Sequence, residues 1–258
     1  LTVLAAQDAR DVETRRLLAR ALLAAGQPDR AVQALDEAVA TGPADPEVVF
    51  LLASEYLWLK RVDAADRLFA QVAKARPIPQ THVLIGRAYR DAGEYERARA
   101  ELQQALAQDP GVRRAHYYLG MVALADAKTG ADRLRQAEAE FREELKLAPE
   151  DPLTSDQLGL ALLDAVRPAE ALPLLETAVR GEARSLFAYH LGRCQLALER
   201  TDEAVASLRR ALELAGEEGA GAAALEPIHF QLGQALRRLG QTEEAAAQLT
   251  EAGRLAAR

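Results

Sequence analysis

The residues in this sequence best placed for covalent chemistry are a cysteine and a histidine four positions apart. His190 and Cys194 would share one side of a helix, where an imidazole can activate a thiol. A thiol nucleophile also needs an oxyanion site and a group that orients its base, and neither is visible in the sequence. We therefore predict that Cys194 is a buried structural thiol. As the only cysteine, it can form no internal disulfide.

The sequence also shows no pattern typical of a metal site or a cofactor site. His82, His116 and His229 occupy equivalent places in a repeating unit, and equivalent places in stacked units are too far apart to share one zinc ion. The stretch GAGAAA from Gly219 follows a predicted helix rather than a strand, so it lacks the geometry of a dinucleotide-binding loop. We expect no cofactor, no metal site and no catalytic residue, and we expect that the protein is not an enzyme.

The elements that position these residues are predicted to be helices. Alanine and leucine dominate the 258 residues and aromatic residues make up only 5%, which favours an all-α chain. The net charge of −7 makes nucleic acid an unlikely partner, because phosphate binding requires an excess of Lys and Arg. No apolar run approaches the roughly 20 residues that span a bilayer, so we expect no direct membrane insertion. The localisation stays open between cytoplasm and periplasm.

The sequence repeats itself, mostly at intervals of 33 or 34 residues, and the repeat is the organising feature of the chain. A small residue recurs in the first half of each copy: Ala19, Ala53, Gly86, Gly120, Gly159, Gly192 and Gly233. A second small residue recurs in the second half: Ala31, Ala65, Ala98, Ala137, Ala171, Ala204 and Ala245. Four positions later comes a large apolar residue: Leu35, Phe69, Leu102, Phe141, Leu175, Leu208 and Leu249.

Each copy therefore reads as a pair of amphipathic helices. The small residues would let the two backbones approach where the helices cross, and the large residues would fill the neighbouring gaps. Gly26, Gly93 and Gly240 fall between the two halves, where a helix end commonly needs a left-handed residue. Several copies end in proline, which would stop the second helix. Such a pair cannot bury its apolar faces alone, so the copies must stack on one another.

This pattern resembles the tetratricopeptide repeat family. The resemblance rests on the small residue of the first helix, an aromatic residue three positions later (Tyr56, Tyr89), the alanine of the second helix and the terminal proline. It covers essentially the whole chain and implies an all-α fold, a right-handed α-α superhelix of antiparallel helix pairs. We expect a single solenoid domain over residues 1–258, with residues 1–11 as the end of a preceding repeat in a longer protein. Its seven repeats would span about 12–45, 46–78, 79–112, 113–151, 152–184, 185–225 and 226–258.

Two insertions interrupt the period. Residues 125–133 lengthen the fourth copy, and we expect them to extend its first helix and its turn. Residues 216–227 are rich in glycine and alanine and would form either a flexible joint or a pair of longer helix ends.

In proteins that this chain resembles, the first helix of each repeat lines a concave groove that holds peptides. Carried over to this sequence, the resemblance predicts a row of groove residues: Arg16, Arg20, Phe50, Ser54, Trp58, Arg87, Arg90, Tyr117, Met121, Asp156, Tyr189, Arg193, Phe230, Gln234 and Arg237. The row has six arginines against one aspartate, interleaved with aromatic residues. Arginine pairs with carboxylates, and aromatic rings give rigid apolar contact. The predicted partner is a protein or peptide with acidic and apolar side chains; self-association stays open. Alternatively, these arginines form salt bridges within the protein and the aromatic rings fill gaps.

These features favour a non-catalytic scaffold that binds a peptide or partner subunit in the groove. A second hypothesis is a recruiting arm of a larger enzyme or of a secretion or assembly machine. Binding of nucleic acid by stacking on arginine and aromatic side chains is a distant third.

Overall fold

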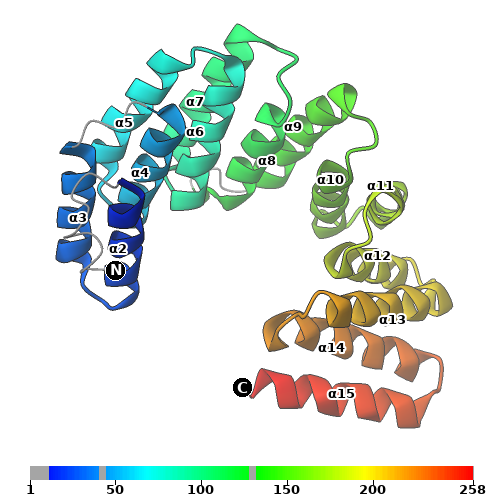
Figure 1. Ribbon diagram of the computed structural model, residues 1–258. Helices are drawn as coiled ribbons and strands as arrows, with labels where there is room; N and C mark the ends of the chain where they lie inside the picture. The colour runs from blue at the N-terminus through cyan, green and yellow to red at the C-terminus, as the bar shows by residue number, and fades with distance from the viewer. Residues whose placement is uncertain (1–11, 41–44, 128–131, 258) are drawn as a thin grey trace. The chain divides into compact units, whose positions relative to one another are not determined.

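The structure, a computed structural model, describes residues 12–40, 45–127 and 132–257. Within these ranges the regular elements are α-helices and no residue lies in a strand, which confirms the predicted all-α class (Figure 1). None of the helices in the described ranges is long and apolar enough to cross a bilayer.

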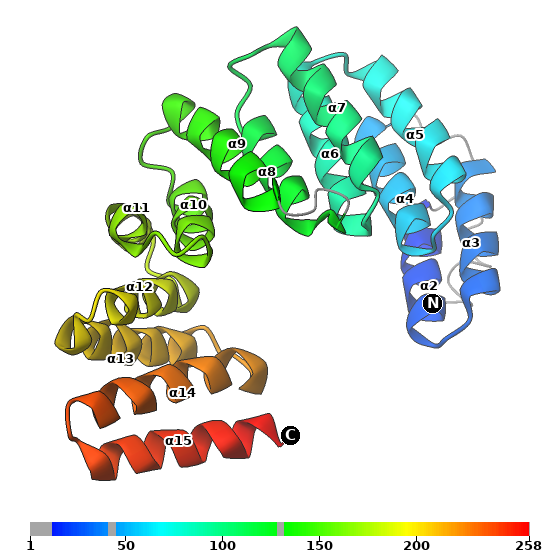
Figure 2. The same cartoon turned by 180° about the vertical axis from the view of Figure 1, so that it is seen from behind.

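The helices alternate between two roles along the chain. The first helices of the hairpins, here called A helices, are α2 (Val12–Ala24), α4 (Pro46–Trp58), α6 (Pro79–Ala92), α8 (Ala115–Ala125), α10 (Pro152–Asp164), α12 (Ser185–Ala197) and α14 (Ala222–Arg238). The second, here called B helices, are α3 (Pro28–Ala40), α5 (Val62–Ala75), α7 (Tyr95–Gln108), α9 (Arg133–Leu147), α11 (Pro168–Gly181), α13 (Thr201–Glu217) and α15 (Thr242–Ala256). Figure 2 shows the same succession from behind.

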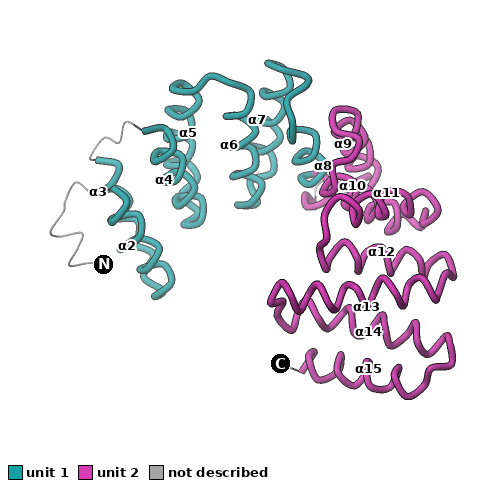
Figure 3. Tube along the Cα trace, turned by 45° about the vertical axis from the view of Figure 1, so that its right-hand side comes forward, with its two compact units in different colours: residues 1–122 teal, residues 123–258 magenta. Residues whose placement is uncertain are grey.

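The chain divides into two compact units, residues 1–122 and 123–258, with the boundary inside α8 (Figure 3). In unit 1, α2, α4 and α6 each pack on the B helix that follows, and α4 also contacts both α2 and α6. In unit 2, α10, α12 and α14 repeat this arrangement with α11, α13 and α15. The A helices of each unit therefore form a continuous layer.

Close helix crossings hold each hairpin together, as the spacing of small and large residues predicts. At Gly86 an added Cβ atom would lie 2.7 Å from Cγ of Leu102, the large residue four positions after Ala98. Ala98 and Leu102 are both fully buried. The same approach recurs at Gly159 against Leu175. Glycine is used where the leucine below leaves no room for a side chain.

The turn between the two helices of a hairpin uses a left-handed residue seven positions after the small residue. Gly26, Gly93 and Gly240 have φ values of 70°, 83° and 75°, which confirms the predicted role. Other repeats place Lys60, Val166 or Glu199 there, with φ values of 57°, 60° and 61°. Side chains with a Cβ atom are strained in this conformation, and β-branched ones most of all.

The two insertions have different outcomes. The first helix of the fourth repeat is not extended: α8 ends at Ala125 with only 11 residues, so that part of the prediction was wrong. The predicted longer turn includes residues 128–131, which lie outside the described residues. The chain leaves the helix there with Asp126 buried. The other insertion forms longer helix ends, because α13 and α14 each have 17 residues. Residues 1–11, expected to end a preceding repeat, lie outside the described residues.

Val166 offers a direct test of the strained turns. Its side chain is 85% exposed, so it contributes little packing, yet its backbone is left-handed. Replacing it with glycine (Val166→Gly) should raise the free energy of unfolding by about 0.5–1 kcal/mol, the relieved strain less the entropy gained by the unfolded chain. Urea denaturation measures this change. The converse variant, Gly93→Val, should be destabilised, and equal stability of both variants and the wild type would contradict the assignment.

Two tyrosines of A helices donate hydrogen bonds to carboxylates of the preceding B helix. The hydroxyl of Tyr56 donates to Asp36 at 2.6 Å, and that of Tyr89 donates to Asp66 at 2.6 Å. Burial, and next the hydrogen bond to the carboxylate, raises the pKa of each phenol. The neutral phenol is therefore favoured in the folded state, and this contribution to stability is present below the ordinary tyrosine pKa of about 10.

The stability advantage of the wild type over Tyr89→Phe should shrink as the pH rises above about 10, because the unfolded chain then loses a proton that the folded chain retains. At neutral pH we expect Tyr89→Phe to cost about 1–2 kcal/mol. Urea denaturation of both proteins at neutral pH and at several alkaline values measures the difference. A difference that stays constant across that range would show that the phenol does not titrate as described.

Candidate protein-interaction site

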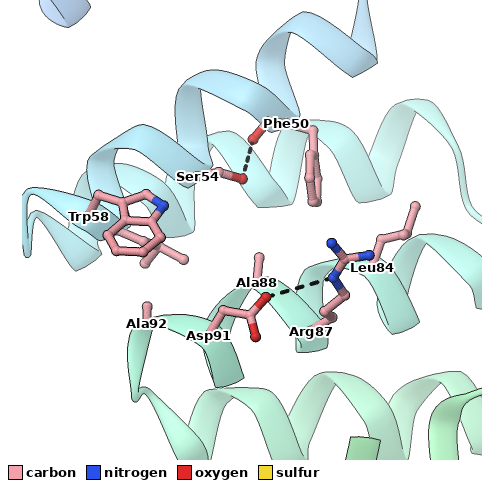
Figure 4. A pocket seen from close by; sticks show the side chains of 9 residues that line it. Phe50, Ser54, Trp58, Leu84, Arg87, Ala88, Asp91 and Ala92 are labelled. Atoms are coloured by element: carbon pink, nitrogen blue, oxygen red, sulfur yellow. Dashed lines mark hydrogen bonds and ion pairs between the residues drawn. The ribbon is translucent and has the colours of Figure 1, made fainter. Parts of the chain in front are cut away.

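A pocket of about 230 Å³ opens between the neighbouring A helices α4 and α6 of unit 1 (Figure 4). Its lining residues come from these two helices alone: Phe50, Ser54, Leu57, Trp58, Leu84, Arg87, Ala88, Asp91 and Ala92. Four of them, Phe50, Ser54, Trp58 and Arg87, belong to the row predicted from the sequence. The structure therefore brings part of that row together around one cavity.

Apolar side chains make most of the wall. Trp58 is 71% exposed and Leu84 is 49% exposed, whereas Leu57 below them is buried. Phe50 is half-buried, with its ring 5.4 Å from the ring of Phe69 in the B helix behind it. The pocket thus combines a fixed aromatic floor with an open indole at its edge, which suits a large apolar side chain of a partner.

The polar groups of the pocket already have partners inside the protein. The Ser54 hydroxyl donates to the carbonyl oxygen of Phe50 at 2.9 Å. Nε of Arg87 lies 3.7 Å from a carboxylate oxygen of Asp91, and Arg90 pairs with the same aspartate. Arg87 and Asp91 are about half exposed, so this ion pair contributes little to stability and leaves both groups open to a ligand.

The remaining predicted residues of unit 1 lie on α2, α6 and α8. Arg16 donates to Glu55 at 3.1 Å and to Glu13, while Nε of Arg20 lies 3.6 Å from Glu55. The hydrogen bond from Arg16 holds the pKa of Glu13 below its ordinary value. The guanidinium of Arg90 lies 5.0 Å from the ring centre of Tyr118.

On α8, the neighbouring rings of Tyr117 and Tyr118 meet edge to face at 5.2 Å, and Met121 is half-buried.

Unit 2 carries the other predicted residues, on α10, α12 and α14. Asp156 is fully buried, and Nδ1 of His190 lies 2.8 Å from its carboxylate, so Asp156 presents no charge at the surface. Asp156 was predicted to line the groove, but it is buried, and His190 is the partner that a carboxylate removed from water needs inside the protein. Arg193 lies 3.6 Å from Asp164 and 5.8 Å from the ring centre of Tyr189.

On α14, Phe230 is 42% exposed, Gln234 is half-buried and Arg237 is exposed. These three residues belong to unit 2 and are not among the residues that line the pocket between α4 and α6.

The predicted excess of arginine along the row is therefore largely balanced. Arg16, Arg20, Arg87, Arg90 and Arg193 each have a carboxylate within 4 Å. Glu55 and Asp164 lie on the A helix next to their arginines, whereas Asp91 lies on α6 together with Arg87 and Arg90. The alternative of salt bridges within the protein is therefore correct for these arginines. The contacts of Arg20 and Arg87, whose side chains are 61% and 53% exposed, are nevertheless long, at 3.6 and 3.7 Å.

Sequence reasoning also missed the leucines of this face. Leu17, Leu51 and Leu84 are 39%, 40% and 49% exposed, and each stands two positions before the small residue of its A helix. A signal was present: in the first three repeats two aliphatic residues precede the small residue. Neighbouring positions on a helix are about 100° apart, so only one of the two can point into the hairpin.

Cys194 and His190 do not contact each other as the thiol–imidazole pair that their spacing in the sequence allows. Cys194 is fully buried, its sulfur contacts the carbonyl oxygen of Pro168 at 3.3 Å, and burial raises its pKa to about 11. Its neighbour His190 is bound to Asp156 rather than to the thiol. In the described ranges, no three or more His, Cys, Asp and Glu side chains gather where they could hold a metal ion.

The family follows from comparison with known sequences. Models of the tetratricopeptide repeat match residues 12–55, 83–152, 157–224 and 226–257. The chain is a tetratricopeptide repeat protein. A search of curated proteins with this sequence found no match.

Solved structures of tetratricopeptide repeat proteins share the fold. MamA from Desulfovibrio magneticus superposes with a TM-score of 0.55 at 24% identity over 69% of this chain and 94% of its own. YrrB, described as having an unusual peptide-binding site, gives a TM-score of 0.58 at 21% identity over 72% of this chain and 91% of its own. A thermophilic protein from Thermus thermophilus gives 0.54 at 22% identity over 74% and 99%. At these identities the likeness establishes the fold alone.

Trp58 is the only tryptophan in the chain, so its fluorescence reports directly on the pocket. Because its side chain is 71% exposed, we expect emission typical of an indole in water and strong quenching by acrylamide. Emission typical of an apolar environment, or protection from the quencher, would mean that the pocket edge is closed in solution.

Proposed function

We propose that this tetratricopeptide repeat protein is a non-catalytic scaffold that binds a peptide or partner subunit on the A helices of unit 1. The pocket between α4 and α6 would anchor the partner by accepting an apolar side chain between Phe50, Trp58 and Leu84. The observation that carries the proposal is the exposure of Trp58 and Leu84 on one face, since large apolar side chains grouped at a surface commonly mark interaction sites.

Two further observations support this proposal. Tetratricopeptide repeat proteins serve as interaction modules, and YrrB, a protein of this fold, is described as having a peptide-binding site. The paired Arg87 and Asp91 at the rim can exchange their mutual contact for contacts with a charged partner, because their separation of 3.7 Å is long for an ion pair.

A double substitution at the pocket tests the proposal. Tagged wild type and Trp58→Ser/Leu84→Ser are recovered from cells of the native host, and bound proteins are quantified by mass spectrometry. Both side chains are exposed, so the fold should tolerate the change. We expect the associated proteins to fall by about tenfold or more, as expected for loss of an anchoring contact worth about 1.4 kcal/mol or more.

The matched control is Ile78→Ser/Leu186→Ser, which removes two apolar side chains that are each 50% exposed and do not line the pocket. This variant should retain the partners. Equal recovery of partners by the wild type, the pocket variant and the control would show that the pocket is not the binding site.

A further inference from the structure

Three leucines of unit 1 form a row that the fold does not require. Leu17, Leu51 and Leu84 occupy the same register on α2, α4 and α6, and all three are exposed. In unit 2 the same register holds Gln157, His190 and Gln231, and these hairpins form without an apolar residue there. We call Leu17, Leu51 and Leu84 the leucine row.

The row is regular because successive A helices of unit 1 touch one another. α4 contacts α2 on one side and α6 on the other. Packed helices have axes about 8–10 Å apart, so successive leucines stand about 10 Å from one another across the layer. Leu84 also lines the pocket, as does Trp58, so the row meets the pocket at Leu84. We call the row and the pocket together the apolar strip.

The polar groups beside the row decide what kind of chain can lie on it. The Ser54 hydroxyl donates a hydrogen bond to the carbonyl oxygen of Phe50. Glu55 accepts a hydrogen bond from Arg16, and Arg87 forms an ion pair with Asp91. An extended or polyproline chain placed across this strip would bury backbone N–H and C=O groups along its whole length, which is costly where they find no partner. Of the polar side chains just named, only Arg87 and Asp91 are exposed enough to meet such groups. An α-helix satisfies its own backbone and needs only side-chain contacts. Seven residues of a helix rise about 10.5 Å, which matches the spacing of the row.

Two arginines beside the row favour acidic side chains on the partner helix. Arg20 and Arg87 follow Leu17 and Leu84 by three residues, so each lies next to its leucine on the helix surface. Their side chains are 61% and 53% exposed, and their carboxylate contacts are 3.6 and 3.7 Å long. In sequence, unit 1 carries 16 basic and 16 acidic residues, whereas unit 2 carries 16 and 23, so the whole net charge of −7 belongs to unit 2. Unit 1 therefore does not repel an acidic partner.

We propose that the leucine row binds an α-helix of a partner protein, whose apolar side chains recur every seven residues and whose flanking side chains are acidic. The apolar side chains would meet Leu17, Leu51 and Leu84, and the acidic ones would meet Arg20 and Arg87. This inference rests on the proposed function of the A-helix face and specifies the class of partner.

Synthetic peptides added to the full chain test the proposal. The first peptide has leucines at every seventh position, glutamates beside them and a helix-forming background of alanine and glutamine. The second has the same composition with its leucines at alternate positions, which share one side of an extended chain but not of a helix, and the third has lysine in place of glutamate. Fluorescence anisotropy measures binding, and circular dichroism measures the helix content that binding induces.

We expect the first peptide to bind and to gain helix on binding, and we expect the second and third to bind about tenfold more weakly or less. Leu51→Ser should weaken the first peptide by a similar factor, and Leu186→Ser, the matched exposed leucine on α12, should have no effect. Tighter binding of the second peptide without helix gain, or equal binding by Leu51→Ser, would overturn the proposal.

Two outcomes separate this inference from the proposed function. If Trp58→Ser/Leu84→Ser loses the native partner but Leu17→Ser/Leu51→Ser retains it, the pocket binds a partner and the helix proposal is wrong. If sedimentation shows a dimer of the wild type that Leu51→Ser dissociates, the row is occupied by a second copy of the chain, and the proposal of a separate partner helix is wrong.

Discussion

The close crossing of two helices in each hairpin is the constraint on which the rest of this protein depends. At Gly86 the backbone of the A helix approaches Leu102 so closely that an added Cβ atom would lie 2.7 Å from it. That contact sets which side of the A helix faces its B helix. The opposite side of the A helix is then left to line a surface, and repetition turns that surface into a continuous layer. Function is therefore confined to residues that the crossing does not use.

Unit 1 and unit 2 share this framework but present different side chains. In unit 1 the free positions hold leucine, tryptophan and phenylalanine next to arginine–carboxylate pairs with long contacts. In unit 2 the register of the leucines holds Gln157, His190 and Gln231, with His190 buried against Asp156, whereas the register of Phe50 keeps aromatic rings at Tyr189 and Phe230. Because both units form the same hairpins, hairpin formation does not require leucine at Leu17, Leu51 and Leu84. This contrast is the physical basis for assigning partner binding to unit 1.

The fold could be predicted almost entirely from the sequence, because it depends on residue size at fixed intervals. The small residues, the large residues four positions after them and the glycines of the turns all took their expected roles. The failure at α8 has a local cause, since the repeat pattern gives no information about an insertion that occurs once. The candidate site was less predictable. Asp156 lies in the register of Phe50 and Phe230, which are half-buried and exposed, yet a histidine of the next A helix covers it. The salt bridges of Arg16, Arg20 and Arg193 depend on carboxylates from neighbouring A helices. Such pairings require the distances between helices, which a single sequence does not provide.

The central claim is that the A helices of unit 1 present the partner-binding face. Methyl NMR of the leucine side chains, recorded as the native partner is added, tests it most directly. The account predicts that the signals of Leu17, Leu51 and Leu84 shift first and most, while those of Leu147 and Leu186, which are exposed in unit 2, stay in place. Shifts confined to unit 2 or to the B helices, with the leucine row unchanged, would contradict it.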